Sequence, residues 1–150
     1  MSIRNKTENH LKVSTLTFHE GINHGGFFQA LCLSKYLENQ KCKVSVLNYK
    51  NRMHWLGEIR AFLYTKRPIR FAKNLFKVLQ FRAQVRKYLP LEPKRLTHDS
   101  KSLAKIVATK DYLVIGSDIV WDHEYKMLGD NQIYFGMGLK PRKGVISYAA

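Results

Sequence analysis

The sequence predicts an α/β fold: a Rossmann-like parallel sheet with flanking helices. Residues 11–18, "LKVSTLTF", are short, apolar and β-branched, as strands are. Residues 25–40 change to a helical period, and residues 43–49, "KVSVLNY", again have a strand pattern. Strand, helix and strand within 40 residues indicate a βαβ unit, which is parallel and crosses over with a right hand. A continuous apolar run at 112–115 predicts a further strand, buried on both faces.

The helix over 25–40 follows from the spacing of its apolar side chains. Phe27, Ala30, Leu31, Ser34 and Leu37 recur at i, i+3, i+4 and i+7, so they share one face. The face is apolar enough to cover a sheet. The segment is therefore predicted to be the crossover helix between the first two strands.

Residues 55–88 have a helical pattern that breaks near Pro68, and proline suits the first turn of a new helix. The second helix carries two apolar stripes. The first comprises Ile69, Ala72, Leu75, Phe76, Leu79 and Ala83. The second comprises Phe71, Val78, Phe81, Val85 and Tyr88. Two stripes predict that this helix is covered on more than one side.

The rest of the chain is predicted to alternate between connections, a short helix and strands. Residues 92–99, "EPKRLTHD", are predicted to be a connection, after which Asp99 or Ser100 caps a helix that runs to Val107. Residues 112–115 form the third predicted strand and residues 144–150, "GVISYAA", the fourth. Because the last residues are apolar, we expect a chain truncated at its C-terminal end.

Charge is concentrated in the middle of the chain. The 150 residues carry 26 Lys and Arg against 11 Asp and Glu, for a net charge of +15. Residues 50–110 contain 16 of those cations and only 3 of the acids. This basic helical segment would attract polyanions: nucleic acid, an anionic membrane surface or phosphorylated substrates. No recognised nucleic-acid module is present, so nucleic acid is disfavoured.

Two cysteines and a polar N-terminus favour a cytoplasmic protein. Cys32 and Cys42 have no cysteine or histidine at metal-ligand spacing, so reduced thiols are expected. The first ten residues lack the apolar core of a secretory signal. No apolar run approaches the length of a membrane-spanning helix.

The stretch "HEGINHGGFFQAL", 19–31, lacks the spacing of the common metal and phosphate motifs. His19 and His24 are five apart in a predicted loop, whereas a zinc pair needs helical i, i+4 spacing, so no metal site is predicted. Gly21 and Gly26 have P-loop spacing, but phenylalanine replaces the required Lys and Ser/Thr. A glycine-bearing turn between strand and helix remains. Its backbone N–H groups can hold an anion or polar ligand.

A second loop, 116–122, "GSDIVWD", follows the third predicted strand. Because the carboxyl ends of parallel strands meet at one edge, Ser117, Asp118 and Trp121 are expected at the same edge of the sheet as the first loop. Two structural roles compete with binding: Ser117 could cap the next helix, and Trp121 could pack in the core.

Together these motifs resemble the polysaccharide pyruvyl transferase family from about residue 12 to the end. The family pattern G-x-x-N-x-G-x-x-x-Q-A matches Gly21, Asn23, Gly25, Gln29 and Ala30. A G-S-D-Q-V-W-N pattern matches "GSDIVWD", and an I-S-Y-A-A strand after an aromatic pair matches "ISYAA" after Tyr134 and Phe135. Ile119 and Asp122 differ from the family's Gln and Asn, which affects the expected acceptor contacts.

The resemblance implies that residues 1–150 are the N-terminal half of a two-domain, glycosyltransferase-B-like enzyme. Such enzymes transfer pyruvate from phosphoenolpyruvate to two sugar hydroxyls as a ketal, in cell-surface or exopolysaccharide biosynthesis. Phosphoenolpyruvate is the donor substrate, and no further cofactor is implied. The partners would be a saccharide or lipid-linked glycan acceptor and the missing C-terminal domain, which holds most donor-binding residues.

Within this half, Asp118 is the expected catalytic carboxylate, since it can hydrogen-bond a sugar hydroxyl or accept its proton. Expected substrate-binding residues are Asn23, Gly25, Gln29, Ser117 and Trp121.

Two alternatives to an active transferase remain open. The chain could be a truncated remnant without activity of its own. The basic segment 50–110 could instead be a polyanion-binding module for nucleic acid or a membrane surface. With a lipid-linked acceptor, docking of that segment would keep the enzyme peripheral at the inner face of the membrane.

Overall fold

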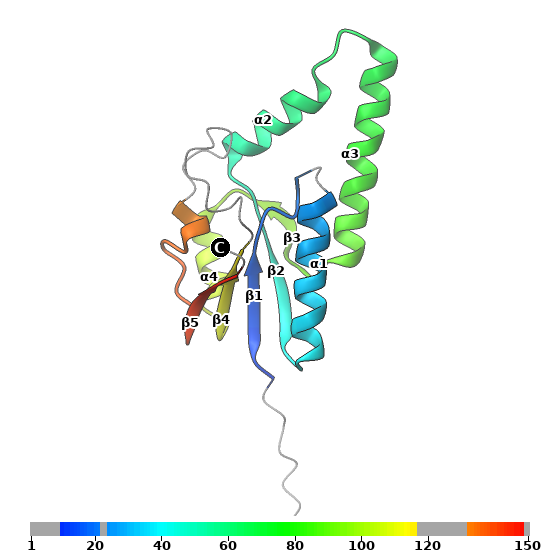
Figure 1. Ribbon diagram of the computed structural model, residues 1–150. Helices are drawn as coiled ribbons and strands as arrows, with labels where there is room; N and C mark the ends of the chain where they lie inside the picture. Colours follow the sequence, from blue (N-terminus) through cyan, green and yellow to red (C-terminus); the bar gives the residue numbers. More distant parts are fainter. Residues whose placement is uncertain (1–9, 22–23, 117–131, 149–150) are drawn as a thin grey trace, which may run out of the picture.

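A computed structural model describes residues 10–21, 24–116 and 132–148. Its centre is a five-stranded sheet in the order β3-β2-β1-β4-β5 (Figure 1). The strands are β1 Lys12–Leu16, β2 Lys43–Tyr49, β3 Leu91–Thr97, β4 Tyr112–Ile115 and β5 Gly144–Ser147. Every neighbouring pair is parallel, which confirms the predicted α/β class and parallel sheet.

Helices cover both faces of this sheet. They are α1 His24–Asn39, α2 Arg52–Leu63, α3 Pro68–Tyr88, α4 Ser100–Val107 and the short 3-10 helix η3 Gln132–Phe135. Two predicted helix starts are confirmed. Pro68 occupies the first turn of α3, and the Asp99 side chain caps α4 by accepting hydrogen bonds from the backbone N–H groups of Lys101 and Ser102.

The two faces have separate apolar cores. On one face α1 and α3 pack on the sheet through Phe27, Ala30, Val46, Phe81, Val85 and Leu89. On the other face α4, η3 and the segment after it pack through Leu16, Leu47, Tyr49, Leu103, Val107, Leu113, Ile115, Tyr134 and Leu139. Each such side chain contributes about 1.5–3 kcal/mol when fully buried. Two covered faces explain why β4 is a continuous apolar run.

The direction of travel across the sheet explains this two-faced arrangement. The chain runs outward from β1 to β2 to β3, and then returns to β4 on the far side of β1. Right-handed crossovers in opposite directions place their helices on opposite faces. The point of reversal therefore lies between β1 and β4.

One prediction was wrong. Residues 92–99 were expected to be a connection, but residues 91–97 form the edge strand β3, with Leu91 opposite Val46 and Glu92 opposite Leu47. The segment contains a proline and two adjacent cations, which would disfavour a central strand. An edge strand tolerates both, because one side of it faces solvent.

The two stripes of α3 have different environments. Val78, Phe81 and Val85 of the second stripe are buried in the core, whereas Ile69 and Phe76 of the first stripe are exposed. Figure 1 shows α2 and α3 extending together away from the sheet as an arm. The prediction that α3 is covered on more than one side is therefore confirmed only for the side that faces the core. The first stripe has no cover among the described residues.

Among the described residues, no helix is both long enough and apolar enough to cross a bilayer.

Candidate functional site at the carboxyl edge of the sheet

The segments that follow β1, β4 and β5 meet at one edge of the sheet. Leu16 at the end of β1 pairs with Ile115 at the end of β4, and Ile115 pairs with Ser147 of β5. The Gly116 N–H donates to the Leu16 carbonyl at 3.3 Å, and the Tyr148 N–H donates to the Ile115 carbonyl at 2.8 Å. Ligands of open parallel sheets bind where the strand order reverses, which here is this same edge.

Two glycines permit the close packing of these segments. A Cβ atom at Gly26 would lie 2.6 Å from the Phe18 carbonyl oxygen, and one at Gly116 would lie 2.2 Å from the Tyr148 carbonyl oxygen. Real Cβ atoms do not approach backbone oxygen so closely. Glycine at both positions thus allows α1 to begin directly beside the end of β1, and β4 to end directly beside β5.

The structure describes only part of the predicted site. Gly25 lies exposed in the first turn of α1, and Gln29 lies one turn later, partly buried. Asn23, Ser117, Asp118 and Trp121 lie outside the described residues, as do Ile119 and Asp122. The strands that lead to both loops are adjacent in the sheet.

Beside these loops is a group of mostly buried polar side chains, here called the carboxyl-edge cluster. It comprises Thr17, His19, Glu20, Asn48, Lys50, His54 and Glu58. The first three follow β1, the next two come from the end of β2, and the last two project from α2. The turn from β2 into α2 brings them together, because the Asn51 side chain caps α2 immediately after Lys50.

His19 is fully buried and neutral at physiological pH. Its Nδ1–H donates to the Thr17 carbonyl at 3.1 Å, which leaves Nε2 as the acceptor of the ring. Burial lowers the pKa of His19 to about 4; the Thr17 hydrogen bond opposes this shift and the charge of Lys50 adds to it. His19 therefore presents an acceptor nitrogen rather than a positive charge.

The pKa of Glu20 is shifted in the opposite direction. Burial raises the pKa of the Glu20 carboxyl, although the positive charges of Lys50, Arg82 and Arg86 act against the rise. The Glu20 carboxyl therefore holds its proton more tightly than an exposed glutamate does. Adjacent titratable groups with shifted pKa values are a common property of functional sites.

Lys50 and Glu58 form a buried ion pair under these groups. The Lys50 side chain is 3% exposed and that of Glu58 is 15% exposed, and the ammonium contacts the carboxylate oxygen directly. A Cβ atom at Gly21 would lie 3.4 Å from Glu58, so the pair lies against the glycine turn after β1. The ion pair thereby lies at the carboxyl edge of the sheet, beside Gly21.

Several buried polar atoms of the cluster make no hydrogen bond within the described part of the chain. The clearest are Thr17 Oγ1 and His54 Nδ1. Such atoms are uncommon in folded proteins, and each costs about 1–3 kcal/mol when left unpaired. Their presence at this edge indicates a region where a polar ligand or solvent can bind.

A pocket of about 520 Å³ opens on the α4 side of the same edge. Tyr49, Lys101, Gln132 and Met137 are among the residues that line it. Next to it the buried Tyr134 hydroxyl donates to the Tyr49 carbonyl at 3.2 Å, and this ties η3 to the end of β2. The aromatic pair noted in the sequence is thus held at the carboxyl edge.

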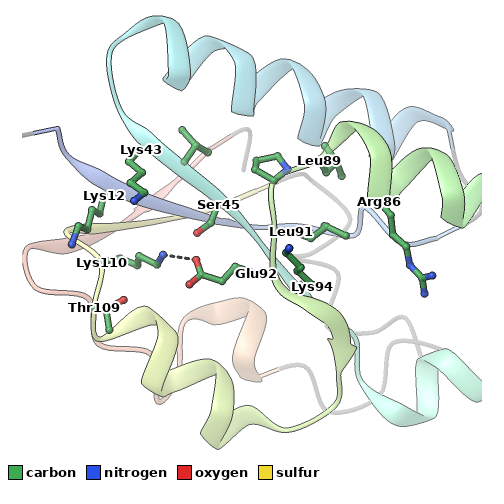
Figure 2. Close-up of a pocket in the computed structure, with 12 residues that line it drawn as sticks. Lys12, Lys43, Ser45, Arg86, Leu89, Leu91, Glu92, Lys94, Thr109 and Lys110 are labelled. Carbon is green, nitrogen blue, oxygen red and sulfur yellow. Dashed lines mark hydrogen bonds and ion pairs between the residues drawn. The ribbon is translucent and has the colours of Figure 1, made fainter.

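A pocket of about 740 Å³ lies at the opposite, amino edge of the sheet. Its charged lining residues are Lys12, Lys43, Arg86, Glu92, Lys94 and Lys110 (Figure 2). Figure 2 shows the ion pair between Lys110 and Glu92 in the middle of the pocket. The pocket is basic, but it lies away from the motif loops.

Sequence reasoning missed the roles of Glu20, Lys50, His54 and Glu58. Only Lys50 carried a readable signal, since it directly follows a predicted parallel strand. Within the part of the chain that the structure describes, no group of three or more His, Cys, Asp or Glu side chains could hold a metal ion.

Comparisons of the chain with protein-family models, curated proteins and solved structures find no match. The functional argument therefore rests on the residues and their geometry.

Proposed function

We propose that the chain is a polysaccharide pyruvyl transferase-like domain that binds a saccharide acceptor at the carboxyl edge of its sheet. The observation that supports this most strongly is the order of the strands that carry the three motifs. Strands β1, β4 and β5 lie side by side although the motifs are far apart in the sequence, and the strand order reverses between β1 and β4.

The proposed reaction joins two hydroxyls of one sugar to carbon 2 of phosphoenolpyruvate. Two C–O bonds form at that carbon while its bond to the phosphate oxygen breaks. One hydroxyl proton ends on the methylene carbon, which becomes a methyl group, and the other leaves with inorganic phosphate. The reaction therefore needs groups that accept and donate protons beside an anionic substrate.

The carboxyl edge offers such groups. Asp118 is the proposed acceptor of a sugar hydroxyl proton, with Asn23, Gln29 and Ser117 as hydrogen-bonding partners of the sugar and Trp121 as a stacking surface. Gly25 lets the backbone approach the ligand. To this set the structure adds Glu20, whose carboxyl holds its proton more tightly than an exposed glutamate does, and the buried Lys50–Glu58 ion pair beside it.

In this proposal the domain is one half of a two-domain, glycosyltransferase-B-like enzyme, and the second domain supplies most of the donor site. The acceptor is a saccharide or a lipid-linked glycan precursor in the cytoplasm. Activity then requires the second domain, and a chain without it would be an inactive remnant.

The test is phosphate release from phosphoenolpyruvate in the presence of a saccharide acceptor, with the protein as its gene encodes it. Formation of the ketal is checked by NMR of the product. Asp118→Asn should lower turnover by about 100-fold or more, the usual scale for removal of a general base. Lys105→Gln, at an exposed position of α4 that does not line the pocket, is the control and should leave turnover unchanged. Absence of ketal with every acceptor would refute the proposal, and full activity of Asp118→Asn would remove that residue from the site.

A further inference from the structure

The exposed stripe of α3 is a large apolar surface on the side of the helix opposite the core. At 100° per residue, Ile69, Phe76 and Leu79 lie within one third of the helix circumference. Their exposed fractions are 72%, 60% and 55%. The core-facing residues Val78 and Val85 lie roughly opposite. The stripe therefore has no role in packing α3 onto its own sheet.

A further exposed aromatic side chain lies at the tip of the arm. Tyr64, at the end of α2, is 76% exposed and lies next to the turn that leads into α3. The Asn74 side chain donates to the Phe62 carbonyl at 2.8 Å and links α3 to α2. Here the arm face denotes Ile69, Phe76 and Leu79.

The charged side chains around this apolar stripe are all positive. Residues 59–91 contain nine Lys and Arg and no Asp or Glu. Lys66 and Arg67 lie in the turn at the tip, and Lys73 and Lys77 border the stripe along the helix. All four are exposed. Their long apolar stems can lie beside the stripe while their charged ends reach outward.

This combination fits one occupant better than the others. A second copy of the chain would bring two faces of the same charge together, so self-association is disfavoured. A membrane with anionic headgroups offers an apolar layer for the phenylalanine, isoleucine and leucine, and negative charge for the flanking lysines and arginines. We infer that the arm face docks on the surface of an anionic lipid bilayer without crossing it.

The inference rests on the proposed function in one respect, since it places the domain near a lipid-linked acceptor. Its evidence comes only from the residues of the α2–α3 arm. Vesicle binding is measured without donor or acceptor. A chain that failed to make a ketal could still bind lipid, and an active enzyme could fail to bind it. The two proposals therefore fail separately.

The experiment is co-sedimentation of the 150-residue chain with phosphatidylcholine vesicles that contain about 30 mol% phosphatidylglycerol, against pure phosphatidylcholine. Binding is expected only to the anionic vesicles, and it should be lost in about 0.5 M salt. Ile69→Ser/Phe76→Ser and Lys73→Gln/Lys77→Gln should each lower the partition coefficient about tenfold or more.

Two matched variants serve as controls. Tyr36→Ser removes an exposed aromatic side chain from α1, and Lys101→Gln/Lys105→Gln removes two lysines with the same spacing from α4. Both should bind like the wild type, and circular dichroism should show that all four variants are folded.

Three results would overturn the inference. The first is no binding of the wild type to anionic vesicles, and the second is binding that is indifferent to Ile69→Ser/Phe76→Ser. The third is occupation of the arm face by something else. This would appear as self-association that the same variant abolishes, or as equally tight binding to single-stranded oligonucleotides.

Discussion

Gly116 lies against Tyr148 so closely that a Cβ atom at 116 would stand 2.2 Å from the Tyr148 carbonyl oxygen. The two residues belong to motifs more than thirty positions apart in the sequence. Their contact holds the carboxyl ends of β4 and β5 together. The packing of β4 against β5 therefore requires glycine at position 116, whether or not a ligand binds nearby.

Gly116→Ala should destabilise the domain by about 3 kcal/mol, because the backbone of β4 or β5 must move to admit the methyl group. Gly144→Ala is the matched control, since its Cβ would meet only the Tyr112 ring, at 3.9 Å. The control should change the free energy of unfolding by less than about 1 kcal/mol. Urea unfolding of the three proteins measures both values, and equal effects at the two positions would contradict this account.

Acidification should destabilise the domain through His19. The pKa of His19 is about 4 in the folded chain, whereas an unperturbed histidine has a value of 6.5. Between these values the unfolded chain binds more protons, so the free energy of unfolding falls as the pH is lowered from about 6.5 to about 4. The contribution of His19 is about 3 kcal/mol over the whole window.

Urea unfolding of wild type and His19→Gln between pH 7 and pH 4 isolates this contribution, since carboxylates titrate in both proteins. The variant should show the shallower pH dependence. NMR titration of the His19 ring in the wild type is an independent check, and a ring that becomes protonated near pH 6.5 would contradict the assignment.

The buried Lys50–Glu58 pair should be costly to break from one side. Lys50→Met leaves the Glu58 carboxylate without its nearest cation, and Glu58→Leu leaves a buried ammonium. Each should cost about 3–5 kcal/mol. The double variant should cost clearly less than the sum of the two. A double-mutant cycle measures the coupling, and additive effects would show that the pair does not act as a unit.

The Lys110–Glu92 pair in the amino-edge pocket should behave differently (Figure 2). Partial burial would raise the pKa of Glu92, but the hydrogen bonds from Lys110 and Ser45 and the charges of Lys110 and Lys43 outweigh it and lower the pKa. Because the Glu92 side chain is 39% exposed, solvent weakens the pair. Glu92→Gln should cost less than about 1 kcal/mol, and a larger loss in thermal unfolding would contradict this.

The fold was largely readable from the sequence because most elements have strong local patterns. The apolar run of β4 and the caps at Pro68 and Asp99 each placed an element. Edge strand β3 was missed, because its proline and cations are permitted only by its position in the sheet.

The site was less readable. The rule for parallel strands predicted that both glycine loops follow strands at one edge, but not that β1 and β4 are neighbours, which the structure shows. The carboxyl-edge cluster did not follow, because Glu58 reaches Lys50 only once α2 turns back over the end of β2. That turn depends on the tertiary structure, and no local sequence pattern predicts it.

The most direct test of the central claim, that the carboxyl edge binds the acceptor, is NMR mapping of backbone amides during titration with acceptor saccharides. The account predicts shifts at Gly21, Gly25, Gln29 and Gly116, around the meeting point of β1 and β4. Shifts that cluster instead at Lys12, Lys43 and Lys110, in the amino-edge pocket, would contradict it.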